Sequence, residues 1–221
     1  MAFRVKDHEV INNDGHPTMF GHQEKIASVQ IGTQIWMAEN LRVKHYRNGD
    51  PIPTGYSNSD WADLDDPETG AYAVYDDNPM NEKVYGLLYN WYAVNDSRGL
   101  APEGWHIPSY DEFDTLQTYV ENNYTSNDAY ALKEAGFVHW NTDAHQIAAT
   151  NATGFTAIGA GGRGSNGDYL VINQQCNFWT TIFRSASGEA WYFSLWFDSA
   201  NGLFTDGDLR TGFSVRCIKD T

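Results

Sequence analysis

Cysteine is scarce in this sequence: two of its 221 residues are cysteine, Cys176 and Cys217. Two are too few for a disulfide-dense scaffold, and their spacing is not that of the Cys-x-x-Cys pairs typical of zinc sites. Both fall in predicted strands near the C-terminus, where a single disulfide between them is geometrically feasible. Two buried free thiols are the alternative, since free cysteine is among the most commonly buried residue types.

Basic residues are also few. The chain has 14 Lys and Arg against 29 Asp and Glu, and a formal net charge of -15. Because phosphate contacts need a basic surface, this balance excludes sequence-independent nucleic-acid binding and disfavours an anionic membrane surface as a partner. The sequence contains no run of eighteen apolar residues, so we also expect no insertion into a membrane.

The N-terminus lacks the apolar stretch of a secretory signal, because charges interrupt it. Residues 1–24 are polar and aperiodic, and we expect them to form an N-terminal arm. We place the protein outside the cell, on a cell surface or on a virion. Either its leader has been removed, or it leaves the cell as phage and virus structural proteins do.

Aromatic residues (14%) and glycine (20 residues) are plentiful, which favours a loop-rich domain that contains β-structure. From Asn177 to Asp220, bulky residues alternate with small polar ones, and glycine-containing turns separate the runs. This pattern predicts short antiparallel strands with one buried face. The expected core anchors are Trp179, Trp191, Trp196, Phe213 and Val215.

Two helices are predicted in the middle of the chain. Ser109 and Glu112 form a capping box that begins a helix running to about Glu121. A second short helix spans residues 128–135 and ends at Gly136, a residue suited to a left-handed cap.

Further segments complete the predicted organisation. Residues 25–41 give two strands about a Gly32-Thr33 turn, and the aromatic-rich stretch Tyr85–Val94 resembles a short buried helix. Since no linker or internal repeat is present, we expect residues 25–221 to form a single α+β domain.

The residue types of catalysis and metal binding are present but poorly arranged. His8, His16 and His22 lie in the arm, and His139 and His145 are six residues apart, which is not a metal-ligand spacing. Aspartate pairs such as Asp206 and Asp208 could supply calcium ligands, but solvated turns explain them better. No nucleophile has a base nearby in the sequence. We therefore expect a non-enzyme with no catalytic residues, no metal and no cofactor.

Five blocks occur in the order and approximate spacing of one known family. They are IGTQIWMAENLRV, YGLLYNWYAV, APEGWHIPSYDEF, NATGFTAIGAGGR and GFSVRCIKD, which begin at residues 31, 85, 101, 151 and 212. Through these blocks the chain resembles the Fibrobacter succinogenes major paralogous domain, a family of bacterial surface and secreted domains. The resemblance implies a C-type-lectin-like fold of the kind shared with the formylglycine-generating enzyme, with small antiparallel sheets, two short helices and long loops. It implies no known activity.

The chain departs from the family at one position. Members commonly carry a cysteine where this chain has Ala101, and its usual partner would be the terminal Cys217. Cys176 is the remaining candidate for that pairing. The reactive cysteine pair of the formylglycine-generating enzyme is close in sequence, whereas Cys176 and Cys217 are far apart, so that resemblance extends to the fold alone. A cofactor-assisted oxidase like that enzyme is the less favoured alternative function.

The terminal segment is also similar to the variable proteins of diversity-generating retroelements, in which polar surface positions vary between constant anchors. The resemblance implies display of a binding surface by this segment, with a protein or glycan on another cell surface as partner. An ordinary cell-surface adhesin or carbohydrate-binding domain is the alternative.

Rigid aromatic and adaptable polar side chains of the terminal segment suit a ligand-binding surface. Since Tyr192 and Ser194 alternate with Trp191 and Leu195, they should face outward. The expected ligand-facing set is Phe183, Arg184, Tyr192, Ser194, Asp198, Asn201, Phe204, Asp206 and Arg210.

Overall fold

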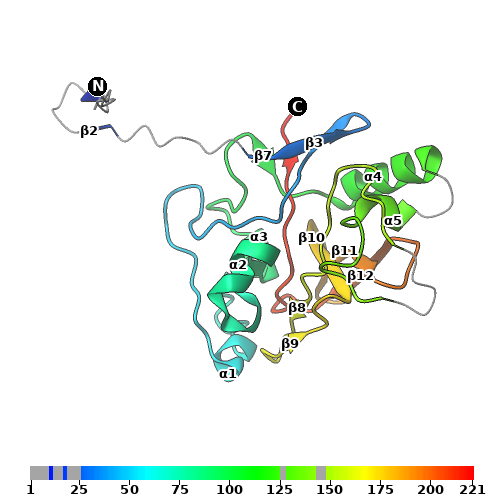
Figure 1. The fold of residues 1–221 in the computed structure, drawn as a ribbon. Helices are drawn as coiled ribbons and strands as arrows, with labels where there is room; N and C mark the ends of the chain where they lie inside the picture. Colours follow the sequence, from blue (N-terminus) through cyan, green and yellow to red (C-terminus); the bar gives the residue numbers. More distant parts are fainter. Residues whose placement is uncertain (1–9, 12–16, 19–25, 125–127, 143–147) are drawn as a thin grey trace, which may run out of the picture.

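The computed structural model describes residues 10–11, 17–18, 26–124, 128–142 and 148–221. Antiparallel sheets and short helices are joined by long loops (Figure 1). This arrangement confirms the predicted α+β class. The described residues contain five α-helices, which is more than the three predicted at residues 85–94, 109–121 and 128–135.

A four-stranded sheet brings together segments from near the beginning and the end of the domain. Its order is β3-β4-β13-β7, so the final strand pairs between strands from much earlier in the chain. As predicted, β3 and β4 form a hairpin, and Gly32 at its turn has a positive φ of 59°. The strands are β3 (Ser28–Ile31), β4 (Gln34–Met37), β7 (Trp105–His106) and β13 (Ile218–Lys219).

A three-stranded sheet of order β10-β11-β12 contains the longest strands. Its strands are β10 (Gln175–Arg184), β11 (Glu189–Trp196) and β12 (Leu203–Gly207). An irregularity in the β10–β11 register between Trp179 and Phe183 separates the buried half of β10 from its exposed tip. Three small two-stranded sheets pair β1 (Val10–Ile11) with β2 (Pro17–Thr18), β5 (Tyr72–Ala73) with β6 (Leu88–Tyr89), and β8 (Gly162–Arg163) with β9 (Tyr169–Leu170).

Helices lie on both sides of the three-stranded sheet: α3 contacts β10 from one side and α4 contacts β10 and β11 from the other (Figure 1). None of the helices in the described ranges has both the length and the apolar character required to span a bilayer. The helices are α1 (Asn58–Ala62), η1 (Tyr75–Asp77, a 3-10 turn), α2 (Pro79–Tyr85), α3 (Trp91–Val94), α4 (Tyr110–Asn123) and α5 (Asp128–Leu132).

The helix predictions were correct where capping signals were explicit. Both hydrogen bonds of the Ser109–Glu112 capping box form, and α4 begins directly after Ser109. Helix α5 ends at Leu132, before the predicted end, although Gly136 does adopt a positive φ of 80°. The single buried helix predicted for Tyr85–Val94 is wrong: α2 ends at Tyr85, β6 follows, and α3 begins at Trp91.

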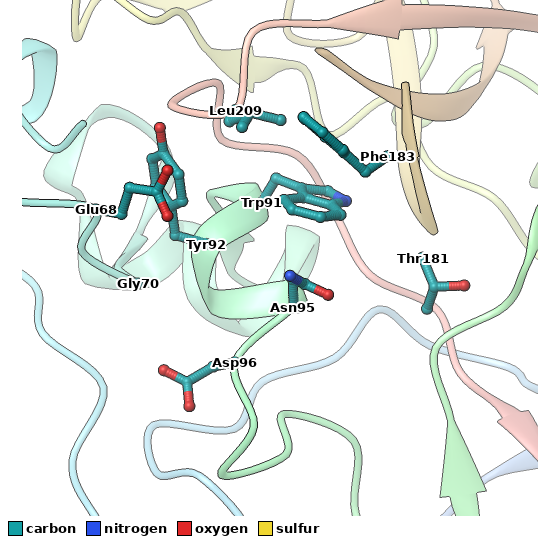
Figure 2. Close-up of a pocket in the computed structure, with 9 residues that line it drawn as sticks. All are labelled: Glu68, Gly70, Trp91, Tyr92, Asn95, Asp96, Thr181, Phe183 and Leu209. Carbon is teal, nitrogen blue, oxygen red and sulfur yellow. The ribbon is translucent and has the colours of Figure 1, made fainter. Parts of the chain in front are cut away.

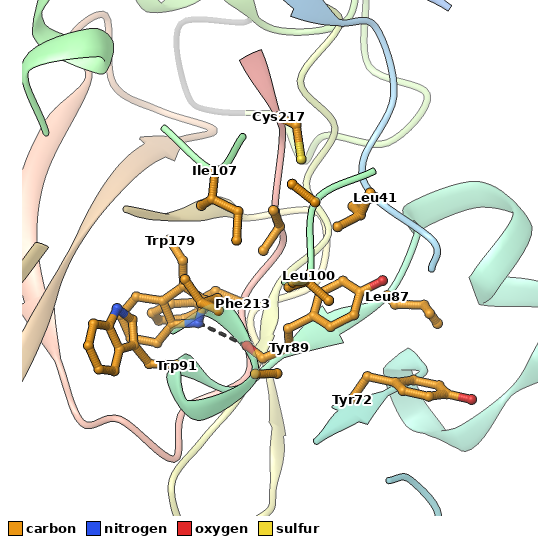
Figure 3. Close-up of a cluster of buried hydrophobic side chains, with 14 of the residues drawn as sticks. Leu41, Tyr72, Leu87, Tyr89, Trp91, Leu100, Ile107, Trp179, Phe213 and Cys217 are labelled. Atoms are coloured by element: carbon orange, nitrogen blue, oxygen red, sulfur yellow. Dashed lines mark hydrogen bonds between the residues drawn. The ribbon is translucent and has the colours of Figure 1, made fainter. Parts of the chain in front are cut away.

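Two hydrophobic clusters cover opposite faces of the same strands. The first includes Trp179, Phe213, Val215 and Cys217, and the indole Nε1 of Trp179 donates to the Tyr89 carbonyl at 2.8 Å (Figure 3). The second is built on aromatic residues of α4, β4, β10 and β11 and contains Cys176, Trp36, Phe113, Phe178 and Phe193. Because β10 and β11 contribute residues to both clusters, these two strands are buried on two faces.

Two of the predicted anchors are not core residues. Trp179, Phe213 and Val215 are buried as expected, but Trp196 is 37% exposed at the end of β11. Trp191 is only half-buried. The sequence pattern assumed one buried face, whereas the core-facing residues of β11 are divided between two clusters.

Candidate functional site

The exposed tip of the three-stranded sheet places four predicted site residues on two faces. Phe183 and Arg184 are neighbours on β10 and therefore point to opposite sides. The ring of Phe183 lies 5.6 Å from that of Trp91, and the guanidinium of Arg184 lies 4.7 Å above Trp191. Arg184 also forms an ion pair with Asp206.

The Arg184 face continues as a row of aromatic rings. Tyr110, the first residue of α4, has its ring centroid 4.1 Å from Phe204 and 5.5 Å from Trp191. In the register of β11 and β12, Trp191 lies opposite Asp206 and Phe193 opposite Phe204. We call the set Tyr110, Arg184, Trp191, Phe204 and Asp206 the aromatic–arginine face.

The expectation that Tyr192 and Ser194 face outward is wrong for Ser194, which is buried, and Tyr192 is half-buried. They do lie on the side of β11 opposite Trp191, but that side packs against the first cluster. The Tyr192 ring centroid is 4.5 Å from that of Phe213, and Ser194 is 2% exposed. The Ser194 hydroxyl donates to Asn177 Oδ1 at 2.7 Å, so it satisfies a buried amide.

The remaining predicted site residues lie elsewhere. Asp198 and Asn201 are exposed in the loop after β11. Arg210 is partly buried and donates to Asp208 Oδ2 at 2.6 Å and to the Ala62 carbonyl at 2.9 Å. The bond to Ala62 ties the loop after β12 to α1, and the hydrogen bonds from Arg210 lower the pKa of Asp208. Arg210 therefore connects this loop to α1 while part of its side chain stays exposed, and its contact with a ligand stays a prediction.

A pocket of about 420 Å³ opens beside α3, on the Phe183 face (Figure 2). Trp91, Tyr92 and Asn95 come from α3 and the residue after it, and Phe183 stands over the indole of Trp91. The other lining residues are Glu68, Gly70, Asp96, Thr181 and Leu209.

The indole of Trp91 is held rigidly at the base of this pocket. It is 6% exposed, and its Nε1 donates to the Thr180 carbonyl at 3.1 Å. Its backbone N–H donates to the Leu209 carbonyl at 2.8 Å, which joins α3 to the chain after β12. Phe183, at 46% exposure, is the most accessible ring of the pocket.

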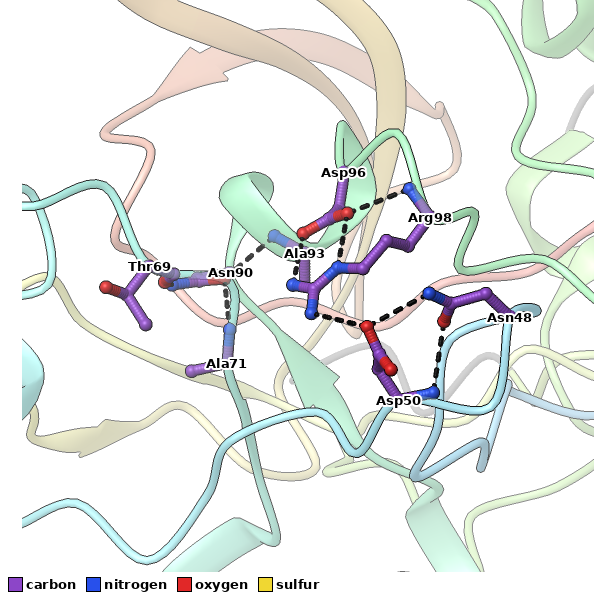
Figure 4. A network of polar contacts seen from close by, with 8 residues as sticks. All are labelled: Asn48, Asp50, Thr69, Ala71, Asn90, Ala93, Asp96 and Arg98. Carbon is purple, nitrogen blue, oxygen red and sulfur yellow. Dashed lines mark hydrogen bonds and ion pairs between the residues drawn. The ribbon is translucent and has the colours of Figure 1, made fainter.

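A polar network fixes the start of α3 beneath the pocket (Figure 4). Asn90 is fully buried; its Oδ1 accepts from the backbone N–H groups of Ala71 and Ala93, and its Nδ2 donates to the Thr69 carbonyl. This bonding satisfies the free donors at the N-terminus of the helix. Gly70 is required in the same segment, since a Cβ there would lie 2.2 Å from the Tyr46 hydroxyl.

Two carboxylates give the pocket a negative charge. Asp96 accepts from Arg98, whose guanidinium also reaches Asp50, and the hydrogen bonds to Arg98 lower the pKa of Asp96 (Figure 4). Glu68 stands beside the Tyr92 ring (Figure 2). Burial, followed by the charge of Glu68, raises the pKa of Tyr92, so its hydroxyl stays protonated at neutral pH.

Sequence reasoning missed most of this pocket. It included Phe183 but treated Trp91 and Tyr92 as part of a buried helix and did not place Glu68 in a site. Asn90 and Asn95 could have indicated that the helix is shorter, because asparagine is suited to the ends of a helix rather than to its interior.

Two of the described histidines, His106 and His139, make side-chain contacts with carboxylates, and the third, His45, is exposed. His106 bonds Glu112 through Nε2 and Asp220 through Nδ1, each at 2.7 Å, and His139 Nδ1 lies 2.9 Å from Glu134 Oε2. His8, His16, His22 and His145 lie outside the described residues. Within the described ranges no group of three or more His, Cys, Asp or Glu could hold a metal ion. Cys176 and Cys217 are free thiols, so of the two alternatives the buried pair is correct.

Comparison with known proteins identifies the family. The family model described as the Fibrobacter succinogenes major domain matches residues 29–219, which is most of the chain. The chain belongs to this family. No curated protein and no solved structure matches it. In this Fibrobacter succinogenes major domain, the matched range includes the pocket, the aromatic–arginine face and every predicted ligand-facing residue.

Proposed function

We propose that this domain is a non-catalytic recognition module that binds a protein or glycan partner at the tip of the β10–β12 sheet. The observation that carries the proposal is the pocket beside Trp91, with the exposed ring of Phe183 at its rim. A concave site with aromatic walls and a few fixed polar groups has the usual anatomy of a ligand pocket. Trp91 and Tyr92 come from α3 and Phe183 from β10, and hydrogen-bonded elements of this kind need little ordering on binding.

The chemistry of the remaining residues supports recognition over catalysis. Burial raises the pKa of Cys176 to about 12 and raises that of Cys217 further, and thiols of this kind are poor nucleophiles. The two cysteines lie in different hydrophobic clusters, which disfavours the alternative of an oxidase that uses a close cysteine pair.

A C-type-lectin-like fold and a place outside the cell belong to the same proposal. Support comes from the long loops, from the pairing of the final strand β13 with the early strand β4, and from a sheet that presents its tip to solvent. In one form of this proposal, a retroelement diversifies the binding surface. That form predicts a nearby imperfect DNA repeat that differs from the coding segment only where the template has adenine. If no such repeat exists, an ordinary surface adhesin or carbohydrate-binding domain is the better description.

Protein and glycan arrays test the function. Wild-type protein should bind a discrete set of ligands, and a Phe183→Ala, Arg184→Ala double variant should lose them, since aromatic and arginine residues that a partner covers dominate such interfaces. Asp114→Ala, an exposed change on α4, is the control and should bind as wild type does. Equal binding by the double variant would place recognition elsewhere on the domain.

A further inference from the structure

The Trp91 pocket combines aromatic rings with carboxylates and contains no basic side chain. Its lining comprises the rings of Trp91, Tyr92 and Phe183, the carboxylates of Glu68 and Asp96, and four uncharged residues. The two acids enter from different segments, one before α3 and one after it.

The two carboxylates are not equivalent. Asp96 is largely neutralised because Arg98 donates to both of its oxygens, at 2.9 and 2.7 Å. Glu68 is exposed and, within the described residues, takes part in no ion pair. One negative charge of the pocket is therefore available to a ligand.

The aromatic walls suit a positive charge carried on an apolar stem. Aromatic faces attract cations through their quadrupole, and the attraction strengthens where water is displaced. The fixed Trp91 indole and the tilted Phe183 ring, at 33° to each other, form two adjoining walls. The chain as a whole has a formal net charge of -15, which draws cations and repels anions.

We infer that this pocket binds an alkylammonium group, with the charge against Glu68 and the methyl or methylene carbons against Trp91, Tyr92 and Phe183. The inference rests on the proposed function, of which it specifies the ligand chemistry. Such a group occurs as the lysine side chain of a protein partner and as a quaternary ammonium headgroup of the choline type. A pocket of about 420 Å³ has room for either, with water beside it.

Choline and its neutral carbon isostere, 3,3-dimethyl-1-butanol, provide the test. Titrations followed by NMR, with the Trp91 indole N–H as reporter, should show saturable binding of choline and at least about tenfold weaker binding of the isostere. Raising the ionic strength from about 0.01 M to about 1 M shortens the Debye length from about 30 Å to about 3 Å and should weaken choline binding. Nα-acetyl-lysinamide, compared in the same assay, distinguishes the two sources by which cation binds more tightly.

Variants locate the site. Phe183→Ala should weaken choline binding about fivefold, which corresponds to about 1 kcal/mol of cation–π and contact energy. Glu68→Gln should weaken it by at least as much, whereas Asp114→Asn, which removes the same charge from exposed α4, should not. Melting curves that match the wild type show that each variant is folded.

Three results would overturn the inference: equal binding of choline and its isostere, equal effects of Glu68→Gln and Asp114→Asn, or saturation of the Trp91 signal by a neutral saccharide but not by choline. If these occur while the arrays still show Phe183-dependent partners, the ligand chemistry is wrong and the recognition function stands. If the arrays fail as well, both are wrong.

Discussion

Individual buried polar side chains hold the loops of this domain. Arg216 is fully buried between Phe155 and Phe178, and it donates to the Phe155 carbonyl and to Asn40 Oδ1. Arg163 lies 4.4 Å above the Trp61 ring and donates to the Tyr56 carbonyl. Since unpaired buried charges are costly, these contacts explain how long connections keep a fixed position.

The two cysteines should be unreactive toward thiol reagents in the folded protein. Cys176 and Cys217 are both 0% exposed, and burial raises the pKa of each thiol, so neither steric access nor thiolate is available. We expect thiol reagents at pH 8 to label neither cysteine in the native state and both in denaturant. Rapid labelling of one native thiol, responsive to copper, would instead favour the oxidase alternative.

His106 makes the stability of the C-terminus depend on pH. Burial favours the neutral ring, but hydrogen bonds to Glu112 and Asp220 outweigh it and raise the pKa of His106. Burial likewise opposes the charge of Glu112, and its hydrogen bonds from Ser109 and His106 lower the pKa of that carboxyl. The contribution of His106 to the free energy of unfolding is therefore complete below about pH 6.5, and it is lost as the pH rises through the pKa of His106 in the folded protein. The contribution of Glu112 is present above about pH 4.5, and it is lost as the pH falls through the pKa of Glu112 in the folded protein.

The corresponding measurement is urea unfolding of wild type and His106→Asn. The difference in unfolding free energy should be larger at pH 6 than at pH 9. His45→Asn, at an exposed histidine, is the control and should give a small difference at both values. A difference for His106→Asn that does not change with pH would show that this ring acts through packing alone.

At the scale of elements, the α4 capping box can be tested directly. The Ser109 hydroxyl accepts from the Glu112 N–H, and Glu112 Oε2 accepts from the Ser109 N–H at 2.8 Å. Ser109→Ala should lower the free energy of unfolding by about 1 kcal/mol. Ser185→Ala, in the exposed turn after β10, should change it by about 0.5 kcal/mol or less. Equal stabilities of the two variants would contradict a capping role.

Elements with local signals were predicted well, and elements defined by distant partners were not. The capping box and the Gly32 turn lie within a few residues of the structure they specify. In contrast, β13 pairs with β4 and β7, and β11 is buried on both faces by segments far away in the sequence. Alternation correctly separated Tyr192 and Ser194 from Trp191, but it could not show that Trp179 and Phe213 pack on Tyr192 or that Ser194 is buried against Asn177.

The pocket illustrates the same limit for the candidate site. Phe183 was predicted because its own segment combines aromatic and polar residues. Glu68, Trp91 and Asp96 come from earlier segments. The bonds of Asn90 hold the start of α3, and the Trp91 indole reaches β10 through its bond to Thr180 and its contact with Phe183. Their role depends on tertiary contacts that no local pattern encodes.

At the scale of the whole molecule, a rigid double-sided core supports an exposed sheet tip, which predicts how substitutions are tolerated. Phe183, Arg184, Asp198 and Asn201 lie at this tip or in the loop after β11. Each exposed change should shift stability by about 0.5 kcal/mol or less, so changing all four should leave a folded protein. Trp179→Ala should cost about 3–5 kcal/mol, because it empties a fully buried aromatic site.

Calorimetry and array binding, applied to the same variants, give the decisive comparison. The fourfold variant should melt within a few degrees of wild type and bind a different set of ligands or none. Adding Tyr192 and Ser194 to the substituted set should destabilise the protein, because Tyr192 packs on Phe213 and Ser194 satisfies Asn177. This contrast separates a variable display surface from its constant framework. If the fourfold variant unfolds, the tip is part of the framework and cannot serve as a diversified surface.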